Sequence, residues 1–284
     1  MLKQRILTAI VLLAIILSAL LVSSPLPFCA VAVAAIAAAG WEWGRLNGYK
    51  DTGSLLMAIV LLVACVIGWQ AGLMARPSPV LWCVVGGIWV LLGAWLLRRG
   101  VGGWAQVPRA VRLIGGLALL WLAWLAIAQA RFVGTNFLLS VMVLVWVADI
   151  GAYFAGRAFG LKFTRSKLAP SISPGKSWEG VWGGMVGVLV LAVAWVWADA
   201  TYGLSPVSLY SLLAARGWWL LVPAVVFLAA MSVVGDLVES LVKRSAGAKD
   251  SSQLLPGHGG VLDRIDALLP AVPLAMMLAT AVGV

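Results

Sequence analysis

Stretches of about 20 almost uninterrupted apolar residues recur along this chain, and they restrict its possible folds more than any other feature. The first is ILTAIVLLAIILSALLV, and similar stretches return as far as the last residues. About 20 residues of α-helix span the roughly 30 Å hydrocarbon core of a bilayer. A soluble protein could not bury this much apolar surface, because 63% of the 284 residues are hydrophobic and only 11% are charged. The stretches are continuous rather than alternating, which disfavours a membrane β-barrel. The sequence therefore predicts an all-α, polytopic integral membrane protein.

We predict about nine transmembrane helices. The first resembles a signal peptide, but its apolar stretch is long and no clear A-x-A site follows, so we expect it to be retained. The second follows it after a very short connection, and the ARPSP segment joins the third and fourth equally tightly. Both short connections predict antiparallel neighbouring helices. The expected ranges are about 6–23, 26–46, 53–73, 79–97, 111–130, 136–157, 178–198, 218–243 and 265–283.

The positive charges predict the orientation of these helices. With a cytoplasmic N-terminus and an outside C-terminus, 17 of the 20 Lys and Arg residues fall on the cytoplasmic side, as the positive-inside rule requires. The net charge of +10 then reflects topology and attraction to anionic lipid headgroups. No predicted soluble segment is long enough to read a nucleic acid groove, so we expect no nucleic acid partner. The three cysteines lie in apolar stretches and predict neither a zinc site nor a disulfide framework.

Two cytoplasmic regions interrupt the apolar pattern, at residues 149–180 and 236–266. Each begins with an acidic residue that still lies inside a predicted helix. We therefore divide the chain into N-terminal transmembrane helices, residues 1–135, and a C-terminal transmembrane region, residues 136–284, which we expect to carry the functional site. This region carries the cytoplasmic loops 158–177 and 244–264.

The eighth predicted helix ends with a polar face. Asp236, Glu239, Ser240 and Lys243 are spaced i, i+3, i+4 and i+7, which places them on one side of a helix, and Arg244 lies on its flank. Carboxylates inside a transmembrane helix are expected to face a polar cavity or a partner rather than lipid. A simpler alternative is a helix end that leaves the membrane with a Glu239–Lys243 pair.

The loop after this helix ends in PGHGGVLDRID. Its glycines allow close approach to a ligand, and a helix starting near Val261 would aim free N–H groups at an anion. Asp263 and Asp266 share one helix face, although two carboxylates at a helix start can also simply complement the helix dipole. His258 alone is a weak signal, equally consistent with a cap or a hydrogen-bonded loop residue.

The combination of carboxylates, cations and a glycine-rich segment favours phosphoryl or nucleotidyl transfer. Carboxylates together with substrate phosphates bind Mg²⁺, and Lys and Arg neutralise the remaining phosphate charge. The chain lacks G-x-x-x-x-G-K-[ST], so it is not a P-loop NTPase. The other loop, KLAPSISPGKSWEG, is either a plain linker or a further phosphate contact. Asp149, near the cytoplasmic end of the sixth predicted helix, should avoid lipid.

These motifs resemble the signature of the phosphatidate cytidylyltransferases, or CDP-diacylglycerol synthases. In that family a Ser-x-apolar-Lys-Arg segment is followed by Lys-Asp, His-Gly-Gly and Asp-Arg-x-Asp. Asp149, KLAP, SPGK and WEG in region 149–180 are similar to the family as well, whereas the first five helices resemble it only in hydrophobic character. The matching residues near the C-terminus are Ser240, Lys243, Arg244, Lys249, Asp250, His258, Gly259, Gly260, Asp263, Arg264 and Asp266.

The resemblance implies that CTP and phosphatidic acid react to give CDP-diacylglycerol and pyrophosphate. It implies Mg²⁺, a second cation such as K⁺, a homodimer, and a bacterial inner membrane with the site facing the cytoplasm. The expected metal ligands are Asp236, Asp263 and Asp266, and the expected catalytic residues are these three with Lys243 and Arg244. The expected substrate-binding residues are Asp149, Lys167, Ser173, Lys176, Ser240, Lys249, Asp250, His258, Gly259, Gly260 and Arg264.

Three other functions are compatible with parts of the sequence. A transporter could use Asp149 and Asp236 to relay protons or bind cations, but no inverted repeat is recognisable and the acids crowd toward one end. Another enzyme of phosphorylated lipids is possible, although the Asp-Gly-x-x-Ala-Arg motif of the CDP-alcohol phosphotransferases is absent. An inactive structural or assembly factor is disfavoured because the charged set is complete.

Overall fold

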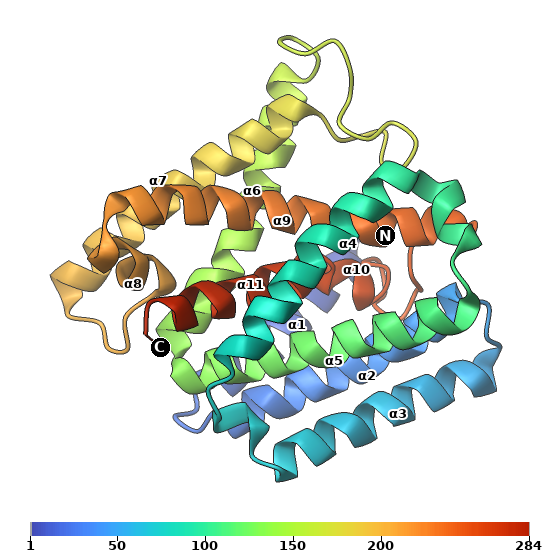
Figure 1. The fold of residues 1–284 in the computed structure, drawn as a ribbon, viewed down its shortest axis with the longest axis horizontal. Helices are drawn as coiled ribbons and strands as arrows, with labels where there is room; N and C mark the ends of the chain where they lie inside the picture. The colour runs from blue at the N-terminus through green and yellow to red at the C-terminus, as the bar shows by residue number, and fades with distance from the viewer. Residues whose placement is uncertain (1, 284) are drawn as a thin grey trace.

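A computed structural model describes residues 2–283 of the chain, and these residues contain helices but no β-strand. Most helices follow one another along the chain with few residues between them, and long loops separate only α6 from α7 and α9 from α10 (Figure 1). They are α1 (Leu2–Leu21), α2 (Leu26–Leu46), α3 (Asp51–Gln70), the 3₁₀-helix η1 (Leu73–Ala75), α4 (Pro79–Gln106), α5 (Arg109–Val133), α6 (Thr135–Phe159), α7 (Trp178–Tyr202), α8 (Leu209–Arg216), α9 (Trp218–Ser245), α10 (Leu262–Ile265) and α11 (Leu268–Ala281).

Eight helical segments in the described part of the chain are long and apolar enough to cross a membrane. They are α2 to α7, α9, and α10 with α11 counted together as Leu262–Ala281. The apolar part of α1, Ile6–Leu21, is shorter. The predicted all-helical, multi-pass architecture is confirmed, whereas the count of nine crossings and the orientation of the termini stay predictions.

Two groups of helices build the core. In one, α2, α3 and α5 pack on one another, and in the other α4, α9 and α11 do so, with α11 also contacting α5. Figure 1 shows α2, α3 and α5 running side by side. The expectation that α3 and α4 are packed neighbours was wrong, because α3 packs on α2 and α5 instead. The turn at Gly72, with φ of +70°, and η1 redirect the chain between them.

The pair α6 and α7 is held together by small residues. A Cβ atom at Gly180 would lie 2.8 Å from the carbonyl oxygen of Ala152, and one at Gly184 would lie 2.6 Å from that of Ala148. Such residues let two helix backbones approach closely, which is how many transmembrane helices associate. The loop 160–177 between these two helices is thereby fixed at their shared end, next to α9.

The helix boundaries lie within four residues of the sequence-based ranges except at the end of α4, and the start of the last helix also differs in form. The fourth helix was expected to end at residue 97, but α4 continues to Gln106 across Gly100, whose φ of +66° breaks the helical backbone. The last helix was expected to start at residue 265, but the chain forms the four-residue α10 first and then α11. Asp263 therefore lies on a short helix in front of the long one. The eight-residue α8, capped by Ser208, was not predicted.

The charged loops collect at one end of the helices. In Figure 1 the α2–α3, α4–α5 and α9–α10 connections lie on the right, with the α6–α7 loop above them, while α8 and the C-terminus lie on the left. Both polar regions identified in the sequence are therefore brought to one end of the protein.

Candidate active site

A polar hollow lies between α6, α7 and α9. Asp236 on α9 forms an ion pair with Lys176 from the α6–α7 loop, and Ser240 donates a hydrogen bond to the same carboxylate at 3.2 Å. The hollow has a volume of about 410 Å³, and Asp149 on α6 and Arg157 also line it. Asp149 and Asp236 therefore line the same hollow, and their separation from lipid stays a prediction.

A second charged cluster lies one helical turn along α9. The amine of Lys243 lies 2.5 Å from the carboxylate of Glu239 and 2.6 Å from that of Asp263, and all three side chains are largely buried. The alternative Glu239–Lys243 pair is therefore present, but Lys243 also holds Asp263. Asp263 thus lies against the polar face of α9, as expected, and Lys243 makes the contact between them.

The loop before α10 wraps around Asp263. The backbone N–H and the hydroxyl of Ser251 each lie 3.0 Å from this carboxylate, and the N–H of Gly260 donates to it at 2.8 Å. Gly259 has φ of +86°, and a Cβ atom there would lie 2.8 Å from the carboxylate of Asp263. The glycines of His-Gly-Gly therefore allow close approach to a protein carboxylate.

Glu42 on α2 is a buried carboxylate that the sequence prediction missed. Its side chain is completely buried and accepts hydrogen bonds from the backbone of Val261 at 2.9 Å and Leu262 at 2.6 Å. The hydroxyls of Ser252 and Ser251 lie 2.5 and 3.1 Å from it. The N–H groups that were expected to be free for a ligand anion are therefore taken by Glu42. Its signal in the sequence is one acid in the apolar run AIAAAGWEWG.

The exposed basic residues connect the two loops. Arg244 lies within 3.4 Å of the carbonyl oxygens of Ile172 and Ala248, one from each loop. Lys167 donates to the carbonyl of Pro174 at 2.5 Å. The α6–α7 loop, which also carries Ser173, is thereby folded back on itself and held against the end of α9.

The remaining predicted residues lie farther along the α9–α10 loop. Arg264 donates twice to the carbonyl oxygen of His258, at 2.6 and 3.1 Å. Lys249 and Asp250 line a separate hollow of about 540 Å³ together with Arg45. The structure therefore brings the predicted residues to one end of the protein but distributes them over neighbouring clusters.

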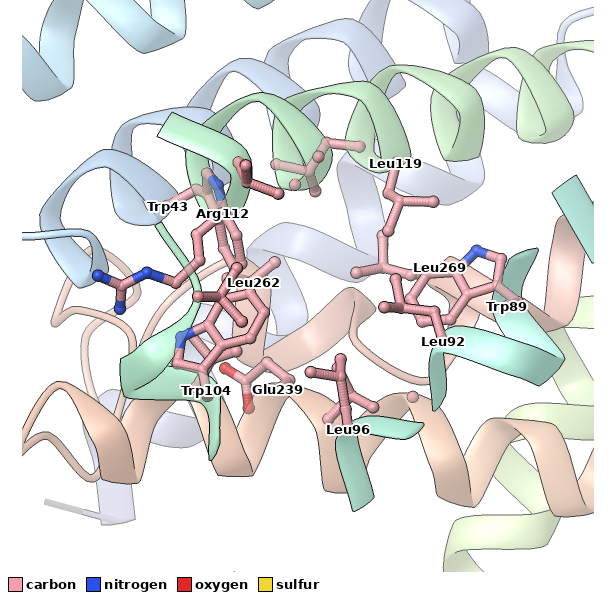
Figure 2. Close-up of a pocket in the computed structure, with 18 of the residues that line it drawn as sticks. Trp43, Trp89, Leu92, Leu96, Trp104, Arg112, Leu119, Glu239, Leu262 and Leu269 are labelled. Atoms are coloured by element: carbon pink, nitrogen blue, oxygen red, sulfur yellow. The ribbon is translucent and has the colours of Figure 1, made fainter. Parts of the chain in front are cut away.

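An apolar cavity of about 240 Å³ lies on the other flank of α9. Figure 2 shows Glu239 projecting from α9 into this cavity beside Trp104 and near Leu262. Both carboxylate oxygens of Glu239 lack a well-directed hydrogen bond, so Lys243 is the group that compensates its charge. Glu239 separates this apolar cavity from the Asp263 cluster.

Carboxylates of the kind that bind cations gather at this end of the helices, but the described residues do not form the expected set of three. Asp149 and Asp236 place two carboxylates in the same hollow, and Lys176 offsets one of these charges. A divalent cation would neutralise the excess. Between residues 2 and 283, however, no three His, Cys, Asp or Glu side chains are placed as ligands of one ion. Lys243 lies against Asp263, so joint ligation by Asp236, Asp263 and Asp266 stays a prediction.

Comparison with known proteins identifies the family. The model of the cytidylyltransferase family matches residues 3–282. The phosphatidate cytidylyltransferase of Pseudomonas aeruginosa is 41% identical over 100% of this chain and 98% of its own. That of Haemophilus influenzae is 39% identical over 96% of both chains. That of Brucella melitensis is 35% identical over 96% of this chain and 91% of its own. With matches that run through both polar loops and all the helices between them, the chain belongs to the cytidylyltransferase family.

Proposed function

We propose that this protein transfers CMP from CTP to phosphatidic acid, giving CDP-diacylglycerol and pyrophosphate for phospholipid synthesis. The observation that carries the proposal is the end-to-end match to relatives named phosphatidate cytidylyltransferase. The site supports it, because carboxylates and Lys or Arg side chains from α6, α9 and two loops gather at one end of the helices. A lipid substrate can keep its chains in the bilayer while its phosphate reaches such a site.

The residues divide into cation ligands and phosphate ligands. Asp236 and Asp263 are proposed to hold Mg²⁺, and Asp266 assists or holds a second cation such as K⁺. A bound Mg²⁺ ion supplies charge neutralisation for the nucleotide phosphates. Lys176 and Lys243 contact carboxylates in this structure, and binding of a cation there would release both amines toward phosphate oxygens.

The transfer itself needs positioning more than proton removal. The phosphate of phosphatidic acid is already ionised near pH 7, so one of its oxygens can attack the α-phosphorus of CTP without a strong general base. The new P–O bond forms as the bond to pyrophosphate breaks. Lys167, Lys176 and Arg244 neutralise the charge that grows on the leaving group, and a preorganised site of this kind lowers the barrier by orientation and electrostatics.

We further propose that this end of the protein faces the cytoplasm of a bacterial cell and that the protein is a homodimer of the inner membrane. The excess of Lys and Arg on this side supports the orientation, and CTP is available there. Labelling of single cysteines placed at residues 50 and 204 of a cysteine-free variant in intact cells tests it. Protection of residue 50 and reaction of residue 204 with an impermeant maleimide are expected, and the opposite pattern contradicts the orientation.

The activity is tested with protein purified in detergent and supplied with dioleoyl phosphatidic acid, CTP and Mg²⁺. Pyrophosphate release and a lipid product with the mass of CDP-diacylglycerol are expected. Diacylglycerol is the matched control lipid, because it lacks the attacking phosphate, and UTP and dATP test the nucleotide. If pyrophosphate is released with none of the nucleotides, the proposed function is wrong.

One variant connects the activity to the site. Asp236→Asn keeps the size of the side chain and the hydrogen bond from Ser240 but removes a negative charge from the hollow. We expect kcat to fall by about 10²–10³-fold, as for loss of one strong electrostatic contact in an active site. Near wild-type activity at ordinary Mg²⁺ concentrations would exclude Asp236 from the metal site.

A further inference from the structure

Glu42 belongs to the half of the chain that carries none of the sequence signature, yet it contacts the loop around Asp263. It lies near the end of α2, and its exposed fraction is 0%. Burying a carboxylate is strongly unfavourable unless the charge is satisfied by hydrogen bonds. Every hydrogen bond that Glu42 accepts comes from residues 251–262, more than 200 positions away in the sequence.

The donors to Glu42 come from two separate parts of the α9–α10 segment. Ser251 and Ser252 lie in the first half of the loop, and Val261 and Leu262 lie where the loop ends and α10 begins. A single carboxylate therefore fixes the distance between these two parts. Gly260 lies within this clamp, because a Cβ atom there would come 2.4 Å from the carboxylate of Glu42 and closer still to the hydroxyl of Ser251.

The same loop residues position Asp263. Ser251 donates its N–H to Asp263 at 3.0 Å, and its hydroxyl lies between the two carboxylates, 3.0 Å from Asp263 and 3.1 Å from Glu42. Gly260, next to Val261, donates its N–H to Asp263 at 2.8 Å. Any movement of the donors to Glu42 therefore moves the donors to Asp263.

We propose that Glu42 is a positioning residue, which sets the carboxylate of Asp263 for the reaction without touching substrate or metal. This inference rests on the proposed function. It assigns the end of α2 to the active site and explains why a charge is kept inside an apolar helix. A purely structural clamp would stabilise the loop without affecting cation or nucleotide use, and this difference can be measured.

The principal test compares Glu42→Gln with Asp199→Asn. In Glu42→Gln the side-chain N–H₂ would face at least one N–H or O–H group that now donates to Glu42, so that this hydrogen bond is lost. Asp199 is the matched control, because it is also a buried carboxylate, 5% exposed, that accepts hydrogen bonds from Ser208 and Ser211 at the start of α8. It lies near the end of α7 beside α8, and Figure 1 shows α8 at the opposite end of the helices from the α9–α10 loop.

We expect Glu42→Gln to lower kcat about 10²-fold, the cost of a misplacement near 1 Å in an active site, and to raise the Mg²⁺ concentration for half-maximal activity several-fold. Asp199→Asn should lower the melting temperature about as much as Glu42→Gln does, while its kcat stays within about threefold of wild type. Glu42→Asp, which keeps the charge, should recover part of the lost activity. If Glu42→Gln and Asp199→Asn each lose activity in proportion to the fall in their melting temperature, Glu42 has only a structural role.

Hydrogen exchange gives a readout that does not depend on activity. The backbone amides of Val261 and Leu262 should exchange at least tenfold faster in Glu42→Gln than in wild type or Asp199→Asn. The same is expected of the amide of Gly260, which donates to Asp263. If Glu42→Gln does not fold, Ser252→Ala removes one donor to Glu42 without touching Asp263 and should lower kcat about three- to tenfold. Unchanged protection of these amides would overturn the proposal. An inactive wild type would refute the proposed function, whereas hydrogen exchange would still show whether Glu42 holds the loop around Asp263.

Discussion

Replacement of Lys243 tests the electrostatic reasoning about the second cluster most directly. Lys243 is 12% exposed in its side chain and lies between two carboxylates, at 2.5 Å from Glu239 and 2.6 Å from Asp263, whose side chains are 3% and 6% exposed. Lys243→Met keeps the length and the apolar part of the side chain but removes its charge. Two buried carboxylates then lose the cation that compensates them.

The loss of stability in Lys243→Met should come mainly from the uncompensated carboxylate of Glu239. Asp263 keeps its hydrogen bonds from Ser251 and Gly260, whereas both oxygens of Glu239 lack another hydrogen-bond partner and face the apolar cavity of Figure 2. Removing one member of a buried ion pair costs about 3–5 kcal/mol. For a chain of this size, that corresponds to a fall of roughly 6–20 °C in melting temperature.

The assay is thermal unfolding in detergent of four proteins: wild type, Lys243→Met, Lys243→Met with Glu239→Gln, and Lys243→Met with Asp263→Asn. Adding Glu239→Gln should recover at least half of the lost stability, because it removes the uncompensated charge. Adding Asp263→Asn should recover much less. Equal recovery from both second substitutions, or a fall below about 2 °C for Lys243→Met, would refute the reasoning.

Three further predictions concern the loops and the cation. Arg264→Ala removes both hydrogen bonds to the carbonyl of His258, so we expect faster proteolysis of the α9–α10 loop and a several-fold higher KM for CTP, measured against Arg216→Ala as a distant control. Glu179 accepts hydrogen bonds from the backbone of Phe163 and Thr164, and Glu179→Gln should raise hydrogen exchange in the α6–α7 loop while Val261 stays protected. Chelation by EDTA should abolish pyrophosphate release, and Mg²⁺ should restore it while K⁺ alone does not; full activity in EDTA would contradict the cation site.

The sequence predicted most of the helices because their signal is local. Length and hydropathy alone determine that a segment such as Thr135–Phe159 is helical, and its boundaries agreed with the expected range within two residues. Errors arose where a boundary depends on one backbone angle or on distant partners. At Gly100 the helical backbone breaks, and a second helical stretch that was not expected runs on to Gln106. The pairing of α3 with α2 and α5 could not be deduced from the short ARPSP connection, because a tight turn fixes where two helices meet but not whether they pack along their lengths.

The site was predictable in composition and much less so in its contacts. Helical spacing placed Asp236, Ser240 and Lys243 on one face, and the structure agrees. Spacing could not show that Lys176 would pair with Asp236, because that contact joins residues 60 positions apart through the fold of a loop.

Glu42 shows most clearly why local patterns are insufficient for this chain. An acid in an apolar helix predicts a polar partner, but nothing near Glu42 in the sequence identifies that partner. The answer lies in serines and backbone N–H groups at residues 251–262, which α2 reaches because it packs beside α10. The glycines that suggested a ligand cradle are needed for this internal contact as well, since a side chain at Gly260 would displace Glu42. A glycine-rich segment between two carboxylates can therefore be required by the architecture of the site before any ligand is considered.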